Sequence, residues 1–224
     1  MTAAHRATLA YVAPFAAYVV LMQAERALSL PGQIAYPIRL LIVALVLVFR
    51  SRKVMPPRPS FPLWSVAVGV AVFLVWIGPD VLFGPAWRHF ALFENRLTGS
   101  AATSLSPVLL QSIPFLAIRI AGSAVLVPIV EELFWRGWLM RWLIHTEFMS
   151  VPIGQYAPAA FWVTAALFAA EHGSYWEVGL AAGIVYNWWV IRSKNLADAM
   201  LAHAVTNGLL AAYVLLFGQW QYWL

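Results

Sequence analysis

The sequence predicts an all-α fold: a polytopic helical membrane bundle of seven or eight transmembrane helices. Of the 224 residues, 62% are hydrophobic and only 10% are charged, which excludes both an ordinary soluble domain and a disordered chain. The apolar residues occur in successive runs close to the ~20 residues that a helix needs to cross a bilayer. The length suits one bundle, so we expect a single transmembrane domain over residues 1–224.

Charge and cysteine content exclude several classes of protein. The formal net charge is +5, but the basic residues lie in short loops beside apolar runs, a pattern that sets membrane orientation and does not indicate nucleic-acid binding. The chain has no cysteine, which excludes disulfides, a thiolate nucleophile and cysteine-ligated zinc or iron–sulfur sites. The lipid bilayer is therefore the first partner that the composition predicts.

Three N-terminal spans are expected within residues 7–78, at 7–23, 34–49 and 61–78. The first apolar run is long for a signal peptide and no clear cleavage site follows it, so we expect it to be retained as a span. Basic residues without an accompanying acid separate the second and third spans and give the strongest cytoplasmic signal in the chain. They are Arg50, Arg52, Lys53 and Arg58.

The segment 80–105 departs from this pattern because aromatic residues alternate with charged ones, as in Trp87-Arg88-His89-Phe90. An interfacial amphipathic helix and a plain loop both fit such a mixture. Residues 98–106 are small and polar, so we expect them to form a linker.

The motif-bearing core is expected over residues 106–217. Its four spans are predicted at 106–143, 157–171, 177–191 and 196–217. A short basic turn, Arg192–Lys194, precedes the last span, and the positive-inside rule places it in the cytoplasm together with the loop 50–59. With seven spans, the N-terminus is then inside and the C-terminus outside.

Two adjacent carboxylates, Glu131 and Glu132, lie among apolar residues in the first of these four spans. An ionised side chain at membrane depth costs on the order of 2.5–3.5 kcal/mol or more, so such residues are usually functional. If the stretch is helical, Glu132 and Arg136 share a face and can form an ion pair, whereas Glu131 lacks that partner. A paired acid beside an unpaired one suggests one structural and one chemical role. The alternative is a helix end at the membrane surface, where these side chains are simply solvated.

Pro128 precedes the two acids and is expected to perturb the backbone beside them. A proline inside a helix kinks it and frees the carbonyl of Ala124. A proline in a first turn instead opens a new helix, whose dipole would favour the acids. The sequence leaves both alternatives open.

Two further polar pairs lie in apolar spans. Phe168 and His172 are four residues apart, with the histidine at a span end, and His203 and Asn207 are four apart in a region, 199–224, without Asp, Glu, Lys or Arg. Residues four apart share a helix face. A lone histidine would usually make an interhelical hydrogen bond, but an amide on the same face requires partners for both groups.

These residues supply a carboxylate, two imidazoles and an amide, a sufficient set for hydrolysis by an activated water. A carboxylate and an imidazole can take and share the proton, and an imidazole with an amide can stabilise an oxyanion. Zinc is the alternative, with His172, His203 and a glutamate as ligands. It ranks second because the inverted zinc motif H-x-x-E-H would need a histidine where Phe168 stands.

In order and type, these motifs resemble those of the CAAX protease and bacteriocin-processing family, intramembrane proteases also called CPBP or Abi proteins, which include the Rce1-type prenyl-protein endopeptidases. The three motifs lie within residues 131–207. They are Glu131-Glu132-x-x-x-Arg136, Phe168-x-x-x-His172 and His203-x-x-x-Asn207. Trp135 stands where the family usually has phenylalanine. The short chain also resembles the bacterial CAAX-protease-related group associated with exosortase systems.

The resemblance implies a membrane-embedded, metal-independent glutamic endopeptidase that needs no cofactor. By position in the motifs, Glu131 and His172 would activate water. His203 and Asn207 would form the oxyanion site.

The catalytic side chains would be supported by Glu132, Arg136 and Phe168.

The implied substrate is a peptide or a membrane-protein tail, lipidated or not, at the inner membrane of a bacterium. Two hypotheses compete with this one: a zinc-dependent membrane hydrolase, and a non-enzymatic immunity or scaffold protein of the same fold.

Overall fold

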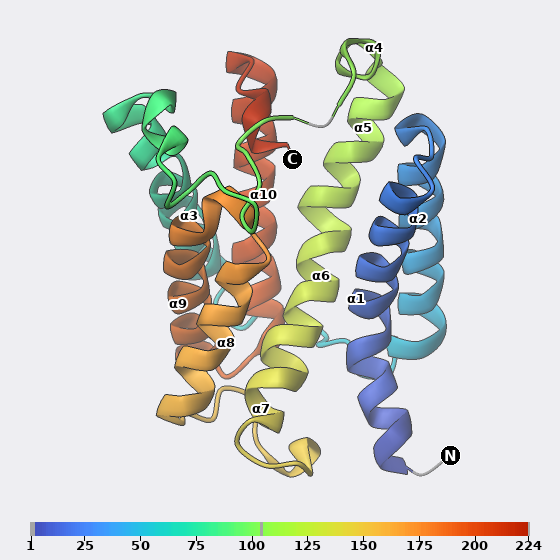
Figure 1. The fold of residues 1–224 in the computed structure, drawn as a ribbon. Coiled ribbons are helices and arrows are strands. Elements are labelled where there is room, and N and C mark those ends of the chain that lie inside the picture. The colour runs from blue at the N-terminus through green and yellow to red at the C-terminus, as the bar shows by residue number, and fades with distance from the viewer. Residues whose placement is uncertain (1–2, 104, 224) are drawn as a thin grey trace.

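The structure, a computed structural model, describes residues 3–103 and 105–223, and most of them are helical (Figure 1). This described part contains no β-strand, only an isolated bridge between Asn95 and Gly99, so the predicted all-α class is confirmed. The α-helices are α1 (Ala3–Ala27), α2 (Gly32–Val46), α3 (Pro62–Phe83), α4 (Pro107–Leu110), α5 (Ile113–Ala121), α6 (Val127–Glu132), α7 (Met140–Trp142), α8 (Pro158–Ala170), α9 (Trp176–Ser193) and α10 (Leu196–Phe217).

Among the described residues, five helical stretches are long and apolar enough to cross a membrane. They are Ala4–Ala27, Gly32–Ser51, Pro62–Phe83, Ile113–Trp142 and Leu196–Phe217. α8 is apolar but has 13 residues, about 20 Å of helix, which is shorter than the ~30 Å hydrocarbon core. Each of the seven predicted spans corresponds to a helix, and the chain is a multi-pass membrane protein.

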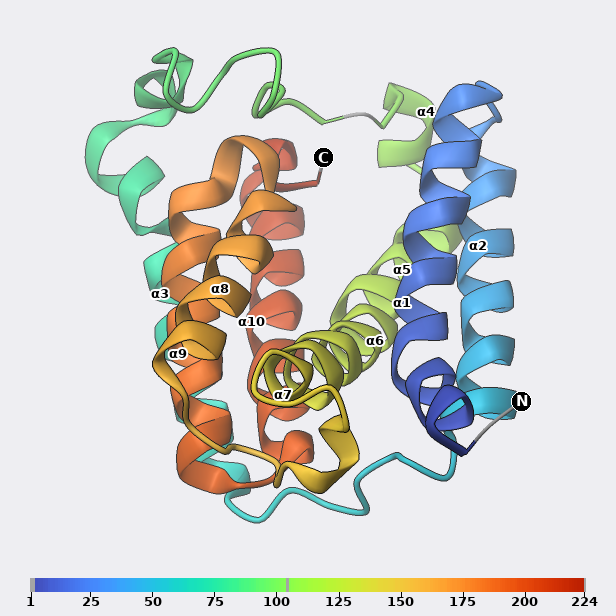
Figure 2. The ribbon, with the colours of Figure 1, turned by 60° about the horizontal axis from the view of Figure 1, so that its bottom comes forward.

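The stretch Ile113–Trp142, which we name the crossing helix, organises the bundle. α1 and α2 form an antiparallel pair on one side of it, and α3, α8, α9 and α10 form the group on the other side (Figure 1 and Figure 2). The crossing helix runs diagonally between the two groups and contacts both α1 and α10. It therefore joins the two halves, and it carries the two adjacent glutamates.

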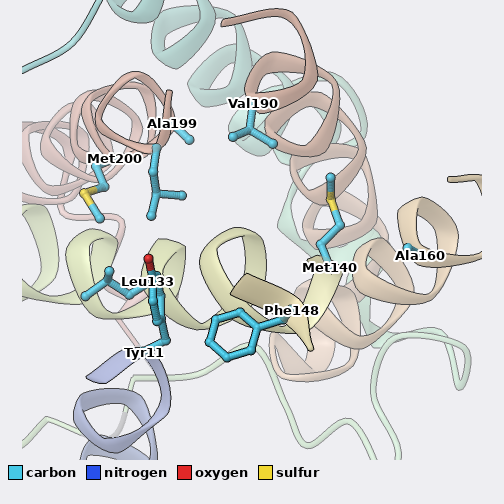
Figure 3. Close-up of a cluster of buried hydrophobic side chains, with 9 residues drawn as sticks. Tyr11, Leu133, Met140, Phe148, Ala160, Val190, Ala199 and Met200 are labelled. Atoms are coloured by element: carbon cyan, nitrogen blue, oxygen red, sulfur yellow. The ribbon is translucent and has the colours of Figure 1, made fainter. Parts of the chain in front are cut away.

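A cluster of buried apolar side chains holds the crossing helix against its neighbours (Figure 3). Tyr11 of α1 lies edge-to-face on Phe148, with ring centroids 5.4 Å apart, and both belong to the same cluster as Leu133 and Met140 of the crossing helix. Such aromatic pairs contribute about 0.5–1.5 kcal/mol beyond the area they bury. Because lipid tails are as apolar as these side chains, close packing is what favours the contact over lipid.

Pro128 lies inside one continuous helical stretch, as the first of the two expected alternatives requires. The helix does not begin anew there, because Val127 already has helical dihedral angles, φ −59° and ψ −50°. Two stretches of π-helix, Gly122–Leu126 and Leu133–Leu139, flank the proline and the glutamates. In a π-helical turn an N–H bonds the carbonyl five residues back, as Val127 does to Gly122. The perturbation takes the form of wider turns within one helical stretch.

One predicted boundary is wrong. α3 continues past the expected end at Gly78 and includes Asp80, because Asp80 is buried against Arg88, which donates its Nε–H to the carboxylate at 2.6 Å. Arg88 is itself buried and also binds Glu177 at 2.7 Å. A single 3₁₀ turn, Pro85–His89, and then mostly irregular backbone follow, so the loop alternative is correct for this segment.

Gly69 marks a close approach of α3 to α10. A Cβ at this position would lie 2.7 Å from the Cβ of Val205 and closer still to the backbone oxygen of Ala202. We expect Gly69→Ala to destabilise the protein by about 1–3 kcal/mol, because α3 would have to move away from α10. Thermal unfolding in detergent measures this. Gly78→Ala is the matched control, since its Cβ would meet nothing within 4 Å, and equal melting temperatures for the two variants would contradict the close packing.

The two basic segments predicted to be cytoplasmic lie at the same end of the bundle. Asn195, in the turn before α10, donates its amide N–H to the backbone oxygen of Arg58, in the loop before α3, at 2.8 Å. The N-terminal end of α1 lies at this end as well, and the C-terminus lies at the other (Figure 1). This arrangement is the one that seven crossings with the N-terminus inside require.

The topology can be tested by labelling, since the chain has no native cysteine. We expect Lys53→Cys and Arg192→Cys to react with an impermeant reagent in inside-out vesicles and to stay unlabelled in intact cells. Leu97 is 97% exposed and follows α3 at the other end, so Leu97→Cys should show the opposite behaviour. Labelling of positions 53 and 192 from different faces would refute the topology.

Candidate active site

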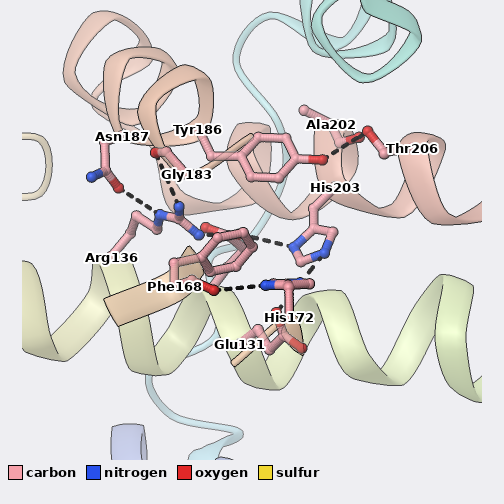
Figure 4. A network of polar contacts seen from close by, with 11 residues as sticks. Glu131, Arg136, Phe168, His172, Gly183, Tyr186, Asn187, Ala202, His203 and Thr206 are labelled. Atoms are coloured by element: carbon pink, nitrogen blue, oxygen red, sulfur yellow. Dashed lines mark hydrogen bonds and ion pairs between the residues drawn. The ribbon is translucent and has the colours of Figure 1, made fainter. Parts of the chain in front are cut away.

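The structure brings the four predicted catalytic residues to one cavity of about 240 Å³. Glu131 comes from α6, His172 from the turn after α8, and His203 and Asn207 from α10. In Figure 4, Glu131, His172 and His203 lie together between the crossing helix and α10. Residues distant in sequence meet here because α6 packs on α10 and because α8 packs on the turns that follow the glutamates.

The predicted ion pair between Glu132 and Arg136 is confirmed. Nη1 of Arg136 lies 2.8 Å from Oε1 of Glu132, and both side chains have no exposed surface. Arg136 also donates from Nε to Oδ1 of Asn187 at 2.8 Å and from Nη2 to the backbone oxygen of Gly183 at 3.3 Å (Figure 4). Its guanidinium lies 4.6 Å from the ring centre of Phe168. The pair therefore joins the crossing helix to α8 and α9, and the surface-solvated alternative is wrong.

His203 lies between the two acids. Its Nδ1 is 3.0 Å from Oε1 of Glu132, and its Nε2 is 4.0 Å from Oε2 of Glu131. Because a carboxylate only accepts, Nδ1 carries the hydrogen and Glu132 fixes the orientation of the ring. Tyr186 stacks on the imidazole with centroids 5.0 Å apart and donates its hydroxyl hydrogen to Thr206 at 2.7 Å. Glu132 thus holds an imidazole as well as an arginine, which its sequence position did not indicate.

His172 lies just beyond the end of α8, in the following turn. Its Nδ1 is 2.6 Å from the backbone oxygen of Phe168, a pure acceptor, so Nδ1 is protonated and Nε2 is left as the acceptor. The ring packs against Phe168, with centroids 4.6 Å apart, and edge-on against Trp76 of α3, with centroids 5.2 Å apart. One fixed tautomer with a free Nε2 lone pair is suited to accepting a proton or binding a metal.

Asn207 donates its side-chain N–H to the backbone oxygen of Ser123 at 2.9 Å. That oxygen lacks the two donors that an α-helical or a π-helical turn would supply, for a reason that the sequence contains. The N–H of Val127, its partner in an α-helix, instead bonds Gly122, and the residue five positions on is Pro128, which has no N–H. Asn207 therefore completes the π-helical turn, and its amide keeps a second hydrogen that could face the cavity.

Glu131 is buried, and its Oε2 makes no hydrogen bond. One carboxylate oxygen each from Glu131 and Glu171, with a ring nitrogen of His172, lie within 4.8 Å of one another. Such a group could hold a metal ion. The zinc set expected from the sequence differs, because His203 is turned toward Glu132 and is not a member of this group.

Sequence reasoning missed two residues of this network, Asn187 and Glu171. Asn187 holds Arg136 and also donates to the backbone oxygen of Phe161 at 2.8 Å. Asn187 could have been found because it is an amide within an apolar span. Glu171 could have been found because it is a carboxylate directly before the motif residue His172.

The fold and site define a class: a polytopic helical membrane protein in which buried carboxylates and imidazoles from separate helices face one polar cavity. Residues 113–209 match the family model described as type II CAAX prenyl endopeptidase Rce1-like. The match confirms the resemblance to the CAAX protease and bacteriocin-processing family that the three motifs predicted, and it supports a CAAX-type intramembrane endopeptidase. No curated protein and no solved structure gives a significant match. The association with exosortase systems stays a prediction.

We expect Glu132→Ala to destabilise the protein, because Arg136 would be left buried and without its counter-ion. Removing one member of a buried ion pair costs roughly 3–5 kcal/mol. Melting of the detergent-purified variant measures the effect, and Glu147→Ala, at an exposed acid, is the control. If Glu132→Ala melts with the parent protein, the pair contributes nothing to stability and its assigned role is wrong.

Proposed function

We propose that the protein is an intramembrane endopeptidase that hydrolyses a peptide bond in a peptide or a membrane-protein tail, with a water activated by Glu131. The observation that carries the proposal is the convergence of Glu131, His172 and His203 on one cavity within the helices. Oε2 of Glu131 is buried and accepts no hydrogen bond from the described residues, so its lone pairs are open to a water molecule in the cavity.

In the proposed reaction, Glu131 takes a proton from water, and the resulting hydroxide adds to the carbonyl carbon of the substrate. Nε2 of His172, the ring nitrogen left without a hydrogen, can share that proton and help to return it to the leaving amine. The C–N bond then breaks, giving a new carboxylate and a new amine.

The charge that develops on the carbonyl oxygen needs hydrogen-bond donors. Nε2 of His203 is one when both ring nitrogens carry a hydrogen, and the bond from Nδ1 to Glu132 fixes the direction in which Nε2 points. The second hydrogen of the Asn207 amide is another, because the first is held by Ser123. Donors fixed in advance in a cavity of low dielectric are worth more than the same donors in water.

A zinc-dependent hydrolase is the second candidate. The observation that favours it is the group of Glu131, Glu171 and His172, whose ligand atoms lie within 4.8 Å of one another. We rank it second because the group offers three ligands only by including the proposed base. A bound metal would then have to supply the activation of water.

We propose that residues 1–224 form one transmembrane domain and that it lies in the inner membrane of a bacterium. Substrates could be lipidated or not, since nothing in the described cavity selects between them. If no peptide terminus depends on the presence of the parent protein, the non-enzymatic immunity or scaffold hypothesis is favoured.

We expect Glu131→Gln to keep the shape of the site and to abolish cleavage. Membrane fractions from cells with the parent and with Glu131→Gln can be compared by proteomics for peptide termini that only the parent produces. Glu147→Gln is the control for an exposed acid and should leave the termini unchanged. Strong chelators should have no effect on cleavage by the parent.

Two outcomes would contradict this mechanism. Parent-type termini that persist with Glu131→Gln would exclude Glu131 as the base. Stoichiometric zinc in the purified active protein, with activity lost on chelation and restored by added zinc, would establish the metal-dependent alternative.

A further inference from the structure

Gly179 of α9 lies directly against the side chain of His172. A Cβ at position 179 would lie 3.1 Å from Cβ of His172 and 3.2 Å from both its Cγ and its Nδ1. Apart from the glycine's own stretch of helix, these are the three nearest atoms among the described residues. Carbon atoms in ordinary contact lie about 3.5–4.0 Å apart. Any side chain at this position would therefore press on the imidazole.

Other contacts enclose the imidazole, so a displacement would disturb at least one of them. Phe168 and Trp76 pack against the ring, with centroids 4.6 Å and 5.2 Å from its own. The backbone oxygen of Phe168 lies 2.6 Å from Nδ1 (Figure 4). Because Nδ1 is one of the atoms that a Cβ at position 179 would meet, the pressure falls on the nitrogen whose hydrogen bond fixes the tautomer.

His172 depends on such contacts because no helix holds it. It follows the end of α8, with φ −90° and ψ 7°. Its N–H bonds the backbone oxygen of Ala169 at 3.0 Å, and its own oxygen accepts from the N–H of Tyr175 at 3.0 Å. These backbone bonds fix the turn, but they leave the side-chain torsions free. The direction of the imidazole is therefore set by its neighbours.

Close packing of α8 on α9 is the alternative reason for a glycine, and it applies one turn further on. A Cβ at Gly183 would lie 3.2 Å from both the Cα and the backbone oxygen of Ala165, which belong to α8. At Gly179, in contrast, the nearest atoms belong to one residue and include its ring. Glycine also destabilises a helix relative to alanine. The helix would gain from alanine at position 179, whereas the imidazole needs the space.

We propose that Gly179 is a positioning residue for the proposed reaction: the missing side chain lets the imidazole of His172 keep Nδ1 on Phe168 and leave Nε2 free. Position 179 lies outside the three motifs. The inference rests on the proposed peptidase function and adds a residue to it. It serves the second candidate equally, because Nε2 would be a proton acceptor in one mechanism and a metal ligand in the other.

The first test is the kinetics of Gly179→Ala on a peptide of the tail identified by proteomics. A misplacement of about 1 Å can lower a rate about a hundredfold, and the shift needed here is a few tenths of an ångström. We therefore expect kcat to fall about tenfold. KM should stay nearly unchanged, since the imidazole acts in the transition state and does not hold the bound peptide. The melting temperature in detergent should match that of the parent.

Two other glycines are the matched comparisons. Gly78→Ala places a Cβ where nothing lies within 4 Å, so it should keep the parent's kcat and melting temperature. Gly183→Ala presses on the backbone of α8 and should melt at a lower temperature. An unchanged kcat in Gly179→Ala would overturn the proposal while leaving the peptidase function standing. Failure of Gly179→Ala to fold would overturn it too, because the glycine would then serve helix packing.

A spectroscopic measurement tests the position of the ring without any cleavage. In protein labelled with ¹⁵N-histidine, the Nδ1–H of His172 should give a slowly exchanging ring signal, which is assigned by its absence in His172→Gln. We expect Gly179→Ala to shift this signal and to speed its exchange with water, and Gly78→Ala to leave it unchanged. An unchanged signal in Gly179→Ala would overturn the proposal, whatever the kinetics. Failure of the peptidase function would show separately, as the absence of termini that depend on the parent.

Discussion

The buried ion pair between Glu132 and Arg136 is the interaction on which the site depends. It has no exposed surface, so each charge is compensated only by protein groups. Those groups come from several helices: Asn187 and Gly183 of α9 hold the guanidinium, and the carboxylate also holds His203 of α10. In a low-dielectric interior, a charge without its partners is strongly unfavourable. The requirement to satisfy this pair therefore fixes how the crossing helix, α9 and α10 meet, and the cavity lies beside it.

The second constraint is the proline beside the acids. Pro128 lacks an N–H and Val127 bonds Gly122, so the backbone oxygen of Ser123 lacks its usual α-helical and π-helical donors. Asn207 supplies the missing hydrogen from α10. The same amide lines the cavity, so one side chain both completes the backbone of the crossing helix and offers a donor to a substrate. The π-helical turn of the crossing helix and Asn207 of α10 therefore depend on each other through this hydrogen bond.

Much of the fold and part of the site could be predicted from the sequence. The apolar runs predicted where the helices lie, and the spacing of Glu132 and Arg136 predicted their ion pair, because both depend on local geometry alone. The end of α3 was misplaced because Asp80 is neutralised by Arg88 beyond the end of the helix. Glu171 was missed since its place near Glu131 depends on how α8 packs on the crossing helix.

By itself, the sequence determined the class of protein, the positions of its apolar spans and the residue types available for chemistry. Hydropathy and four-residue spacing are properties of neighbouring residues, so they can be read without a fold. Only the tertiary structure decided which groups face one another: that His203 bonds Glu132 and that Asn207 is bound to Ser123. These contacts join residues far apart in the chain, and their geometry follows from how the helices cross, which no local pattern encodes.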